Sequence, residues 1–464
     1  MSFRQSAYFL ARVGFIALAC TRDVDGENSP TESGDGETAE VGGDGDGDGD
    51  GDGDGDGDGD GDGDGDGDSQ IELWAGGSHV CAREEDGPLR CWGRNVDGEL
   101  GLASTEEAIG DDELASSAPD VELPAGELET LALGYVNTCA LTSGELRCWG
   151  SGMGGGNGSG STASLGRDET PAELPALALP IAPTNVSLGT AVGCVTSGGN
   201  LYCWGWGQAG LNAMGDGEDY GDDESLEGLP AVDAGGVVER VFPLSVNGCL
   251  EYGDGGVRCW GVTALGMLGV PALSGTGFLG DDEPISEGMN VELPEGIDLV
   301  DVDGGESPIC AHLANGDVYC WGSGNSGVLG YGMGEAAIGD DERPLDVGPV
   351  PIGFPAKQIA AGSRHVCALS EGGDVRCWGQ GALGQLGNGS TQNYGDDEPA
   401  SDSPLVGLPG PATKIVAGEY FTCAVVGQEI YCWGSGEHGV HGRGSIANIG
   451  DDETPEEAGP VPWR

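Results

Sequence analysis

The sequence is poor in basic residues, and in lysine above all. Its 464 residues include 80 aspartates and glutamates but 17 lysines and arginines, and only Lys357 and Lys414 are lysines. A formal net charge of −63 repels the phosphate backbone of nucleic acids, so we expect no nucleic-acid partner. The same charge keeps the protein soluble and attracts cations.

Aromatic residues and long apolar stretches are also scarce. Phe, Trp and Tyr make up 6% of the chain, whereas glycine, with 93 copies, is the commonest residue. Apolar residues come in short runs such as 359–361, which alternate with polar residues or stop within a few positions. Short strands have this pattern, and no long stripe of helical period is evident, so we expect an all-β fold.

Signals for catalysis are missing as well. No nucleophile elbow occurs, and the glycine-rich stretch 154–160 lacks the lysine of a phosphate-binding loop. The histidines do not recur at a shared position beside a candidate nucleophile. We therefore expect neither enzymatic activity nor an organic cofactor. The five histidines are His79, His312, His365, His438 and His441.

What the chain does contain is a long repeat. Cys-Trp-Gly occurs seven times at a spacing of 55 to 61 residues, and each copy has a second cysteine 9 or 10 residues upstream. A fixed period of this length indicates a repeat architecture, in which each unit buries its apolar face against its neighbours. The pairs are Cys81 with Cys91, Cys139 with Cys148, Cys194 with Cys203, Cys249 with Cys259, Cys310 with Cys320, Cys367 with Cys377 and Cys423 with Cys432.

The spacing within each pair predicts a β-hairpin with one cysteine directly opposite the other. A spacing of 9 leaves a two-residue turn such as Ser143-Gly144, and a spacing of 10 leaves a three-residue loop that ends in glycine. Facing cysteines in an exported chain oxidise, so we expect seven disulfides. Reduced, buried thiols are the alternative. A zinc site is not expected, because no Cys-x-x-Cys accompanies the pairs.

The N-terminus has the pattern of an export signal. Residues 1–19 combine arginines, a short apolar run and Ala17-Leu18-Ala19 before Cys20, the one cysteine outside the pairs. This end is similar to a bacterial lipobox and predicts lipidation of Cys20, with plain secretion as the alternative. Residues 20–70 form an acidic linker. Its Gly-Asp repeat at 43–68 predicts an extended spacer, since the closing glutamate of a calcium loop is missing.

The repeat unit resembles that of the regulator of chromosome condensation family. The unit at 362–387 reads GSRHVCAL, then GDVRCWGQG and GQLG, beside the family pattern G-x-x-H-T-x-A-L, G-x-V-x-x-W-G-x-N and G-Q-L-G. The resemblance covers 71–464 and implies a seven-bladed β-propeller with four strands per blade, in which the repeated tryptophans pack between blades. Six units keep a glycine five residues before the first cysteine, and the fourth unit has Leu244 there.

The two ends of the repeat region predict how the ring closes. Full units contain a segment such as 347–352, which the first unit lacks, and the chain ends with a similar segment at 458–463. We expect this C-terminal strand to complete the first blade and so close the ring.

A second motif, Gly-Asp-Asp-Glu, follows each Cys-Trp-Gly by about twenty residues, with Arg167 replacing one aspartate in the second unit. In a propeller these loops lie on one face. They predict hydrogen-bonded turns, a cation site with calcium as the expected ion, or a docking surface for a partner. The candidate ligands are Asp111, Asp112, Glu113, Asp222, Asp223, Glu224, Asp281, Asp282, Glu283, Asp340, Asp341, Glu342, Asp396, Asp397, Glu398, Asp451, Asp452 and Glu453.

Together these features predict an exported, surface-tethered, non-enzymatic propeller that binds an unknown protein partner. A secreted bacterial β-lactamase inhibitor with the same propeller is the precedent. A calcium-binding surface module is the first alternative, and a guanine nucleotide exchange factor, which secretion and acidity disfavour, is the second. We expect a monomer that contacts the membrane only through its lipid anchor. Its expected location is the bacterial outer membrane or cell surface, or otherwise the periplasm or the medium.

Overall fold

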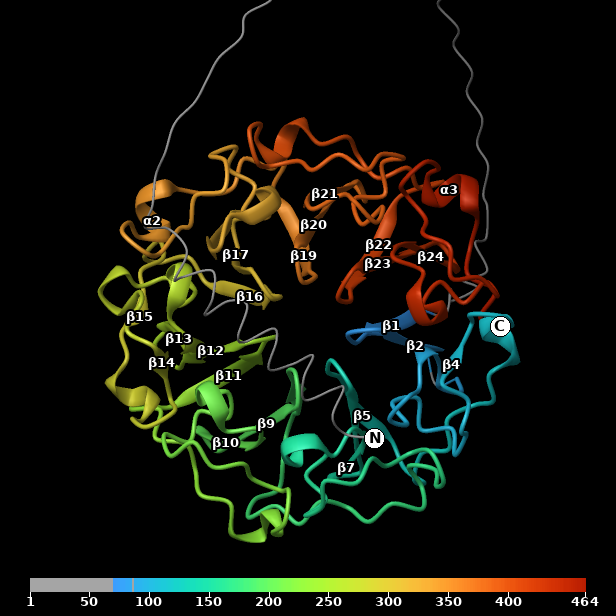
Figure 1. Ribbon diagram of the computed structural model, residues 1–464, viewed down its shortest axis with the longest axis vertical. Coiled ribbons are helices and arrows are strands. Elements are labelled where there is room, and N and C mark those ends of the chain that lie inside the picture. Colours follow the sequence, from blue (N-terminus) through green and yellow to red (C-terminus); the bar gives the residue numbers. More distant parts are fainter. Residues whose placement is uncertain (1–69, 86) are drawn as a thin grey trace, which may run out of the picture. The chain divides into compact units, whose positions relative to one another are not determined.

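Seven antiparallel β-sheets follow one another along the chain and are arranged around a central axis (Figure 1). The computed structural model describes residues 70–464 except residue 86, and these form one unit, Gln70–Arg464. The expected all-β fold, a seven-bladed propeller, is confirmed. The predicted signal, Cys20 and nearly all of the linker lie outside the described residues.

Each sheet contains three main strands, and the first of them lies nearest the axis (Figure 1). The first three blades contain β1 (Ile71–Ala75), β2 (His79–Glu84), β3 (Arg90–Arg94) and β4 (Ala108–Ile109); β5 (Leu128–Leu133), β6 (Asn137–Thr142) and β7 (Glu145–Gly150); and β8 (Ser187–Leu188), β9 (Val192–Ser197) and β10 (Asn200–Gly205). The fourth contains β11 (Val238–Pro243), β12 (Asn247–Tyr252), β13 (Val257–Val262), β14 (Phe278–Leu279) and β15 (Asn290–Val291). The last three contain β16 (Leu299–Gly304), β17 (Pro308–Leu313) and β18 (Val318–Gly322); β19 (Ala356–Ala361), β20 (His365–Ser370) and β21 (Val375–Gly379); and β22 (Ala412–Ala417), β23 (Phe421–Val426) and β24 (Glu429–Gly434).

The expected fourth strand of each blade is very short. It is a two-residue strand in the first and fourth blades and a single bridge elsewhere, as between Gly379 and Tyr394. The bridging residue is the aliphatic or aromatic one that precedes each Gly-Asp-Asp-Glu motif. The motif therefore begins where the outermost pairing of the blade ends.

The hairpin register agrees with the sequence prediction in every blade, because the two cysteines of each pair lie directly opposite each other. Their Cα atoms are 4.0–4.1 Å apart, and their sulfur atoms lie at bonding distance. The oxidised state of the thiols stays a prediction. The facing pairs are Cys81 and Cys91, Cys139 and Cys148, Cys194 and Cys203, Cys249 and Cys259, Cys310 and Cys320, Cys367 and Cys377, and Cys423 and Cys432.

The turns of these hairpins also have the expected backbone geometry. In the two-residue turn of the second blade, Ser143 and Gly144 both have positive φ, of 50° and 78°. In the three-residue loop of the sixth blade, the closing Gly373 has a φ of 88°. Turns of these kinds match the right-handed twist of the flanking strands, and so they hold the cysteines in register.

Each Cys-Trp-Gly tryptophan ties its blade to the preceding one. All seven indoles are fully buried, and each Nε1–H donates to a backbone carbonyl of the neighbouring blade at 2.8–3.3 Å. The repeated tryptophans therefore pack between blades, as expected. The donor–acceptor pairs are Trp92–Val440, Trp149–Glu99, Trp204–Gly156, Trp260–Leu211, Trp321–Met267, Trp378–Val328 and Trp433–Gln385.

The C-terminal segment belongs to the seventh blade. The Val461 N–H donates to the Ile430 carbonyl of β24 at 2.8 Å, as the Val350 N–H does to the Val318 carbonyl two blades earlier. The expectation that this segment completes the first blade is therefore wrong. The segment 347–352 is the outer edge of its own hairpin's blade, and the first blade has its own copy, in which Val121 N–H donates to Leu89 O.

The same segment nevertheless closes the ring. The Ser116 N–H of the first blade donates to the Pro462 carbonyl at 2.8 Å, and the Arg90 Nη1 donates to the Trp463 carbonyl at 3.2 Å. The seventh and first blades thus meet through side-by-side contacts, without sharing a strand among the described sheets.

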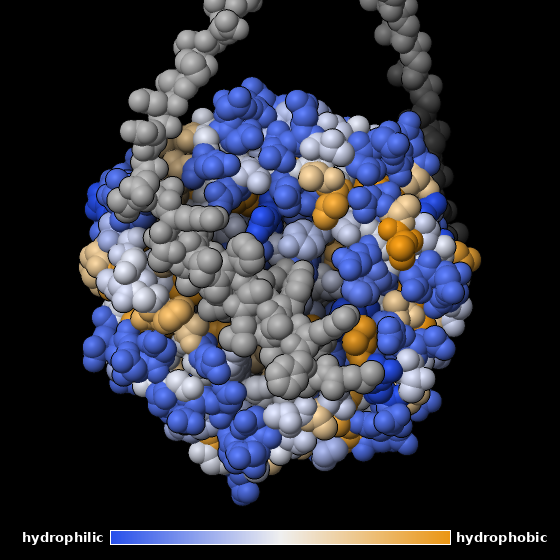
Figure 2. Space-filling model, in the orientation of Figure 1, coloured by the Kyte–Doolittle hydropathy of each residue, from blue (hydrophilic) through white to orange (hydrophobic). Residues whose placement is uncertain are grey.

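Helices play a minor part in the fold. Two α-helical turns, α2 (Pro344–Val347) and α3 (Pro455–Ala458), follow acidic motifs. None of the helices in the described part of the chain is long and apolar enough to cross a membrane. Figure 2 shows hydrophilic residues over most of the visible propeller, with apolar ones scattered between them. The 3-10 turns are η1 (Ala115–Ser117), η2 (Met153–Gly155), η3 (Gln208–Gly210), η4 (Leu226–Gly228), η5 (Ala264–Gly266), η6 (Pro271–Leu273), η7 (Ile285–Glu287), η8 (Asn325–Gly327), η9 (Ala400–Asp402) and η10 (Glu437–Gly439).

The indole hydrogen bond can be tested with Trp378→Phe. This change leaves the buried Val328 carbonyl without its donor. We therefore expect the free energy of unfolding to fall by about 1–3 kcal/mol in addition to the loss of ring packing. Trp463→Phe is the matched control, because Trp463 is equally buried but its Nε1 has no partner among the described residues. Urea unfolding measures both variants. Equal losses would assign Trp378 a packing role alone.

Candidate functional site

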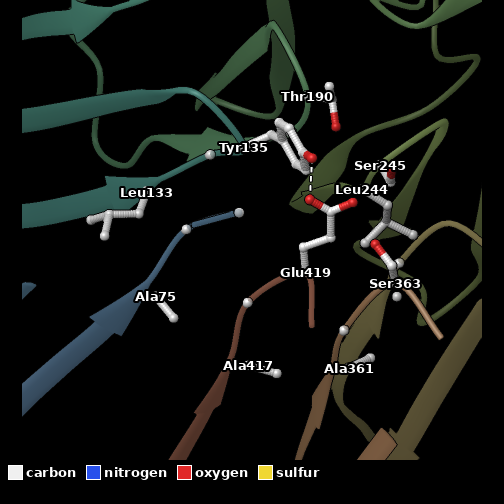
Figure 3. A pocket seen from close by; sticks show the side chains of 18 of the residues that line it. Ala75, Leu133, Tyr135, Thr190, Leu244, Ser245, Ala361, Ser363, Ala417 and Glu419 are labelled. Atoms are coloured by element: carbon white, nitrogen blue, oxygen red, sulfur yellow. Dashed lines mark hydrogen bonds between the residues drawn. The ribbon is translucent and has the colours of Figure 1, made fainter. Parts of the chain in front are cut away.

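The inner ends of the seven blades surround a cavity of about 160 Å³ on the axis (Figure 3). Each blade contributes three consecutive residues, which come from the end of its innermost strand and the loop that follows. Equivalent positions converge on one site in six blades, whereas the lining segment of the fifth blade is shifted by one residue toward its N-terminus. The lining segments are 75–77, 133–135, 188–190, 243–245, 303–305, 361–363 and 417–419.

In six blades a glycine lies five residues before the first cysteine, and it allows the blades to approach at the axis. A Cβ on Gly362 would lie 2.6 Å from the Gly418 carbonyl oxygen, and one on Gly418 would lie 2.6 Å from that of Gly76. Such distances exclude any side chain without a backbone shift. The Gly77 N–H also donates across blades to the Gly134 carbonyl at 3.1 Å. The glycines thus form a ring that holds the inner loops together, a function that the sequence pattern alone did not reveal.

The residue after each ring glycine gives the cavity its chemistry. We call these residues the polar tier, because six blades have a polar side chain there and the first blade has Gly77. Three members are hydroxyl residues, two are glutamates and one is a tyrosine, and all of them except Glu306 line the cavity. The members are Tyr135, Thr190, Ser245, Glu306, Ser363 and Glu419.

Two members of the polar tier meet across the cavity. The Tyr135 hydroxyl of the second blade donates a hydrogen bond to Oε2 of Glu419 in the seventh blade (Figure 3). The first blade lies between them, and a Cβ on Gly77 would lie 2.6 Å from the Tyr135 ring. The missing side chain at Gly77 therefore leaves room for this pair. Sequence reasoning overlooked the tier because its members share a position and not a residue type.

Asp303 is the second carboxyl group that lines the cavity. It lies opposite Cys310 in the register of the fifth blade, where most other blades have an apolar residue. Its Oδ2 accepts from the Ala361 N–H at 2.9 Å and its Oδ1 from the Gly304 N–H at 2.8 Å. Burial, reinforced by the charge of Asp301, nevertheless raises the pKa of Asp303 from 3.8 to about 7.

The acidic motifs form hydrogen-bonded turns. In the fifth blade Oδ1 of Asp340 accepts from the Asp341 N–H at 3.1 Å, and the same bond recurs in four other blades. In the third blade Oε1 of Glu224 accepts a hydrogen bond from the Gly221 N–H at 2.8 Å. These bonds are what the turn interpretation predicts.

The motif glycine also joins neighbouring blades. The Gly280 carbonyl accepts from the Gly215 N–H and the Gly395 carbonyl from the Gly332 N–H, each at 3.0 Å. In the second blade the Arg167 guanidinium donates to the Thr105 carbonyl of the first blade at 2.9 Å. The arginine therefore has a structural role at a joint between blades.

The motif carboxylates still converge within each loop. Carboxylate oxygens of Asp340, Asp341 and Glu342 lie within 4.8 Å of one another, and four other motifs with the full Asp-Asp-Glu show the same grouping: 111–113, 222–224, 281–283 and 396–398. Burial and a hydrogen bond with Asp341 raise the pKa of Glu342 to about 7. Calcium binding by these loops stays a prediction.

The family histidines are structural. Nε2 of His79 lies 2.9 Å from Oγ1 of Thr138, and Nε2 of His365 lies 2.8 Å from Oγ1 of Thr422, in each case on the next blade. Burial lowers the pKa of His79 to about 3 and that of His365 to about 4, so both rings are neutral at physiological pH. Neither histidine lines the axial cavity.

Comparison with known proteins agrees with this architecture. A family model described as the regulator of chromosome condensation (RCC1) repeat matches residues 315–369 and 372–425, and a second one of the same description matches 356–385. The fold is that of a seven-bladed propeller, shared with human WBSCR16 at a TM-score of 0.60 and 18% identity, over 78% of this chain and 93% of that one. Yeast RCC1 (Prp20) bound to Kap60 gives a TM-score of 0.61 at 17% identity, over 83% and 84%.

Curated relatives contain the same repeats. The E3 ubiquitin-protein ligase HERC2 of Mus musculus is 28% identical over 329 residues, which are 69% of this chain and 6% of HERC2. The ultraviolet-B receptor UVR8 of Arabidopsis thaliana is 28% identical over 281 residues, which are 60% of this chain and 59% of UVR8. The chain thus spans less than two thirds of either relative. Its repeats match those of the regulator of chromosome condensation (RCC1) type.

The raised pKa of Asp303 predicts that the stability of the protein depends on pH, and that Asp303→Asn makes this dependence smaller. Because the folded-state pKa lies above the ordinary 3.8, the folded protein keeps a proton that the unfolded chain has lost between about pH 4 and 7. Stability is therefore lost as the pH rises through this window. We expect Asp303→Asn to lose less stability than the parent between pH 5 and pH 8, by on the order of 2–4 kcal/mol. Urea unfolding at both pH values measures the difference, and parallel pH profiles would refute the assignment.

Variants of the fifth blade distinguish the two interpretations of the acidic motif, a hydrogen-bonded turn and a calcium site. We expect millimolar calcium to leave the melting temperature unchanged, and Asp340→Ala to lower stability by about 1 kcal/mol through the lost turn bond. Asp341→Ala is the control, because the Asp341 carboxylate is not the acceptor of that bond. A calcium-induced rise in melting temperature that disappears when Asp340 and Asp341 are both asparagine would instead establish a calcium site.

Proposed function

We propose that this propeller is a non-enzymatic scaffold that binds a protein partner through the face on which the axial cavity lies. The proposal includes the export and the lipidation of Cys20 that the N-terminal pattern predicts, with plain secretion as the alternative. One observation carries the proposal. Seven inner loops, of which neighbours are joined by backbone hydrogen bonds at five of the seven junctions between blades, form a polar surface around a hollow of only about 160 Å³.

The size and rigidity of this surface favour recognition of a partner over conversion of a substrate. Pockets that bind drug-sized ligands measure about 300–1,000 Å³, which is well above the volume of the axial cavity. Loops that are already fixed lose little conformational freedom on binding, and this lowers the entropic cost of association. A preformed loop face of this kind suits a folded protein surface.

The relatives provide precedents of a general kind. Yeast Prp20 has been solved with Kap60 bound, and another Prp20p structure concerns binding to Gsp1p and histones. At 17% identity these likenesses concern the fold, so they support protein binding as a use of the fold and name no partner for this chain. The net charge of −63 favours a partner with a basic contact surface.

A variant on the face that contains the axial cavity tests the proposal. Trp206 follows β10 at the same end of the third blade as Thr190, because the register pairs Gly205 with Val192. Its half-buried ring has the character of an interface anchor. Surface and secreted proteins from the source organism are captured with the immobilised full chain, and each is then titrated.

We expect Trp206→Ala to weaken binding of the specific partner at least tenfold. Val237→Ser is the matched control: Val237 is 67% exposed and lies at the hairpin end of the strands, beside Gly199. Equal binding of every captured protein to the parent and both variants would contradict the proposal.

A further inference from the structure

The axial cavity has the size of one side chain. Its volume of about 160 Å³ is close to the roughly 150 Å³ of an engineered protein cavity that holds benzene. A nucleotide or a folded segment does not fit this space, whereas a single alkyl chain with a polar head does. The occupant must therefore be a small molecule or one projecting side chain.

The charge of the lining favours a cation. Asp303 and Glu419 contribute carboxyl groups, and no lysine or arginine is among the lining residues, all of which lie in the described part of the chain. The hydroxyl groups of Thr190, Ser245 and Ser363 and the backbone carbonyls of the ring supply further acceptors. An anion would meet like charge here.

The rest of the lining favours an organic cation over a metal ion. Leu133, Leu188 and Leu244 line the cavity together with small apolar side chains. Calcium requires six to eight oxygen ligands at about 2.3–2.6 Å, which apolar walls do not provide. A primary alkylammonium group needs acceptors only for its three N–H donors and places its apolar stem against apolar walls.

We propose that the axial cavity binds a primary alkylammonium group, with the Glu419 carboxylate as its anionic partner. Tyr135 acts as a positioning residue, since its hydroxyl holds Oε2 of Glu419 across the cavity. The ammonium comes either from a lysine side chain of the protein partner, in which case the inference rests on the proposed function, or from a free amine. Both sources share the same chemistry in the cavity.

Butylammonium chloride is the probe, titrated into the full chain at constant ionic strength. We expect saturable binding by calorimetry or by chemical-shift changes of the cavity residues. Glu419→Gln should weaken it at least tenfold, while Glu429→Gln, which removes an exposed charge from the same blade, should leave it unchanged. Equal binding of the uncharged 1-butanol, equal effects of the two substitutions, or displacement of the amine by equimolar calcium chloride would overturn the proposal.

A second variant keeps the test decisive if Glu419→Gln does not fold. Ala417 lines the cavity, so Ala417→Leu should fill the space and abolish butylammonium binding without changing any charge. Unchanged binding would refute the location. Spermidine and a peptide with a single lysine distinguish the sources: tighter binding of the peptide assigns a protein side chain, and tighter binding of spermidine assigns a free polyamine. The butylammonium titration contains no protein partner. A negative result in it therefore refutes the ammonium site alone, and the titrations of the partner with Trp206→Ala test the proposed function independently.

Discussion

The hydrogen bond from each Cys-Trp-Gly indole to the preceding blade is the contact on which the ring depends. It joins the largest fully buried side chain of one blade to a loop carbonyl of its neighbour, and it recurs seven times. The paired cysteines act at a different level, because they link two strands within a blade. Strand geometry is thus fixed inside each blade, and blade-to-blade geometry is fixed by the tryptophans and the glycine ring.

Closure of the ring follows from the same contact. The Trp92 indole of the first blade donates to the Val440 carbonyl of the seventh, as every other indole does to its own neighbour. Gly418 likewise contacts Gly76 across the junction. The ends of the described region therefore need no shared strand, because the joint between first and last blades has the same chemistry as the internal ones.

Features that depend on local spacing, such as the hairpin register, could be predicted from the sequence. Features that depend on how the blades meet at the axis could not. The distance between paired cysteines determined the hairpin register, since a two- or three-residue turn leaves one possible alignment. The expected place of the segment 458–463 was wrong, because sequence similarity shows that a segment recurs but not which neighbouring hairpin it joins. The site was missed for a related reason. Tyr135 and Glu419 are 284 residues apart, and only ring closure brings them together.

Near the axis, a position that is almost constant among the blades lies beside one that varies from blade to blade. A side chain on any of the six ring glycines would require a backbone shift, whereas the fourth blade accommodates Leu244, whose side chain lies near Gly304 of the next blade. The adjacent position lines the cavity in six blades and has no such constraint, so the blades have glycine, tyrosine, hydroxyl residues or glutamate there. One residue position thus maintains the scaffold while its neighbour is free to diversify. A repeat fold obtains an asymmetric site in this way, because seven equivalent backbones present different side chains to the same axis.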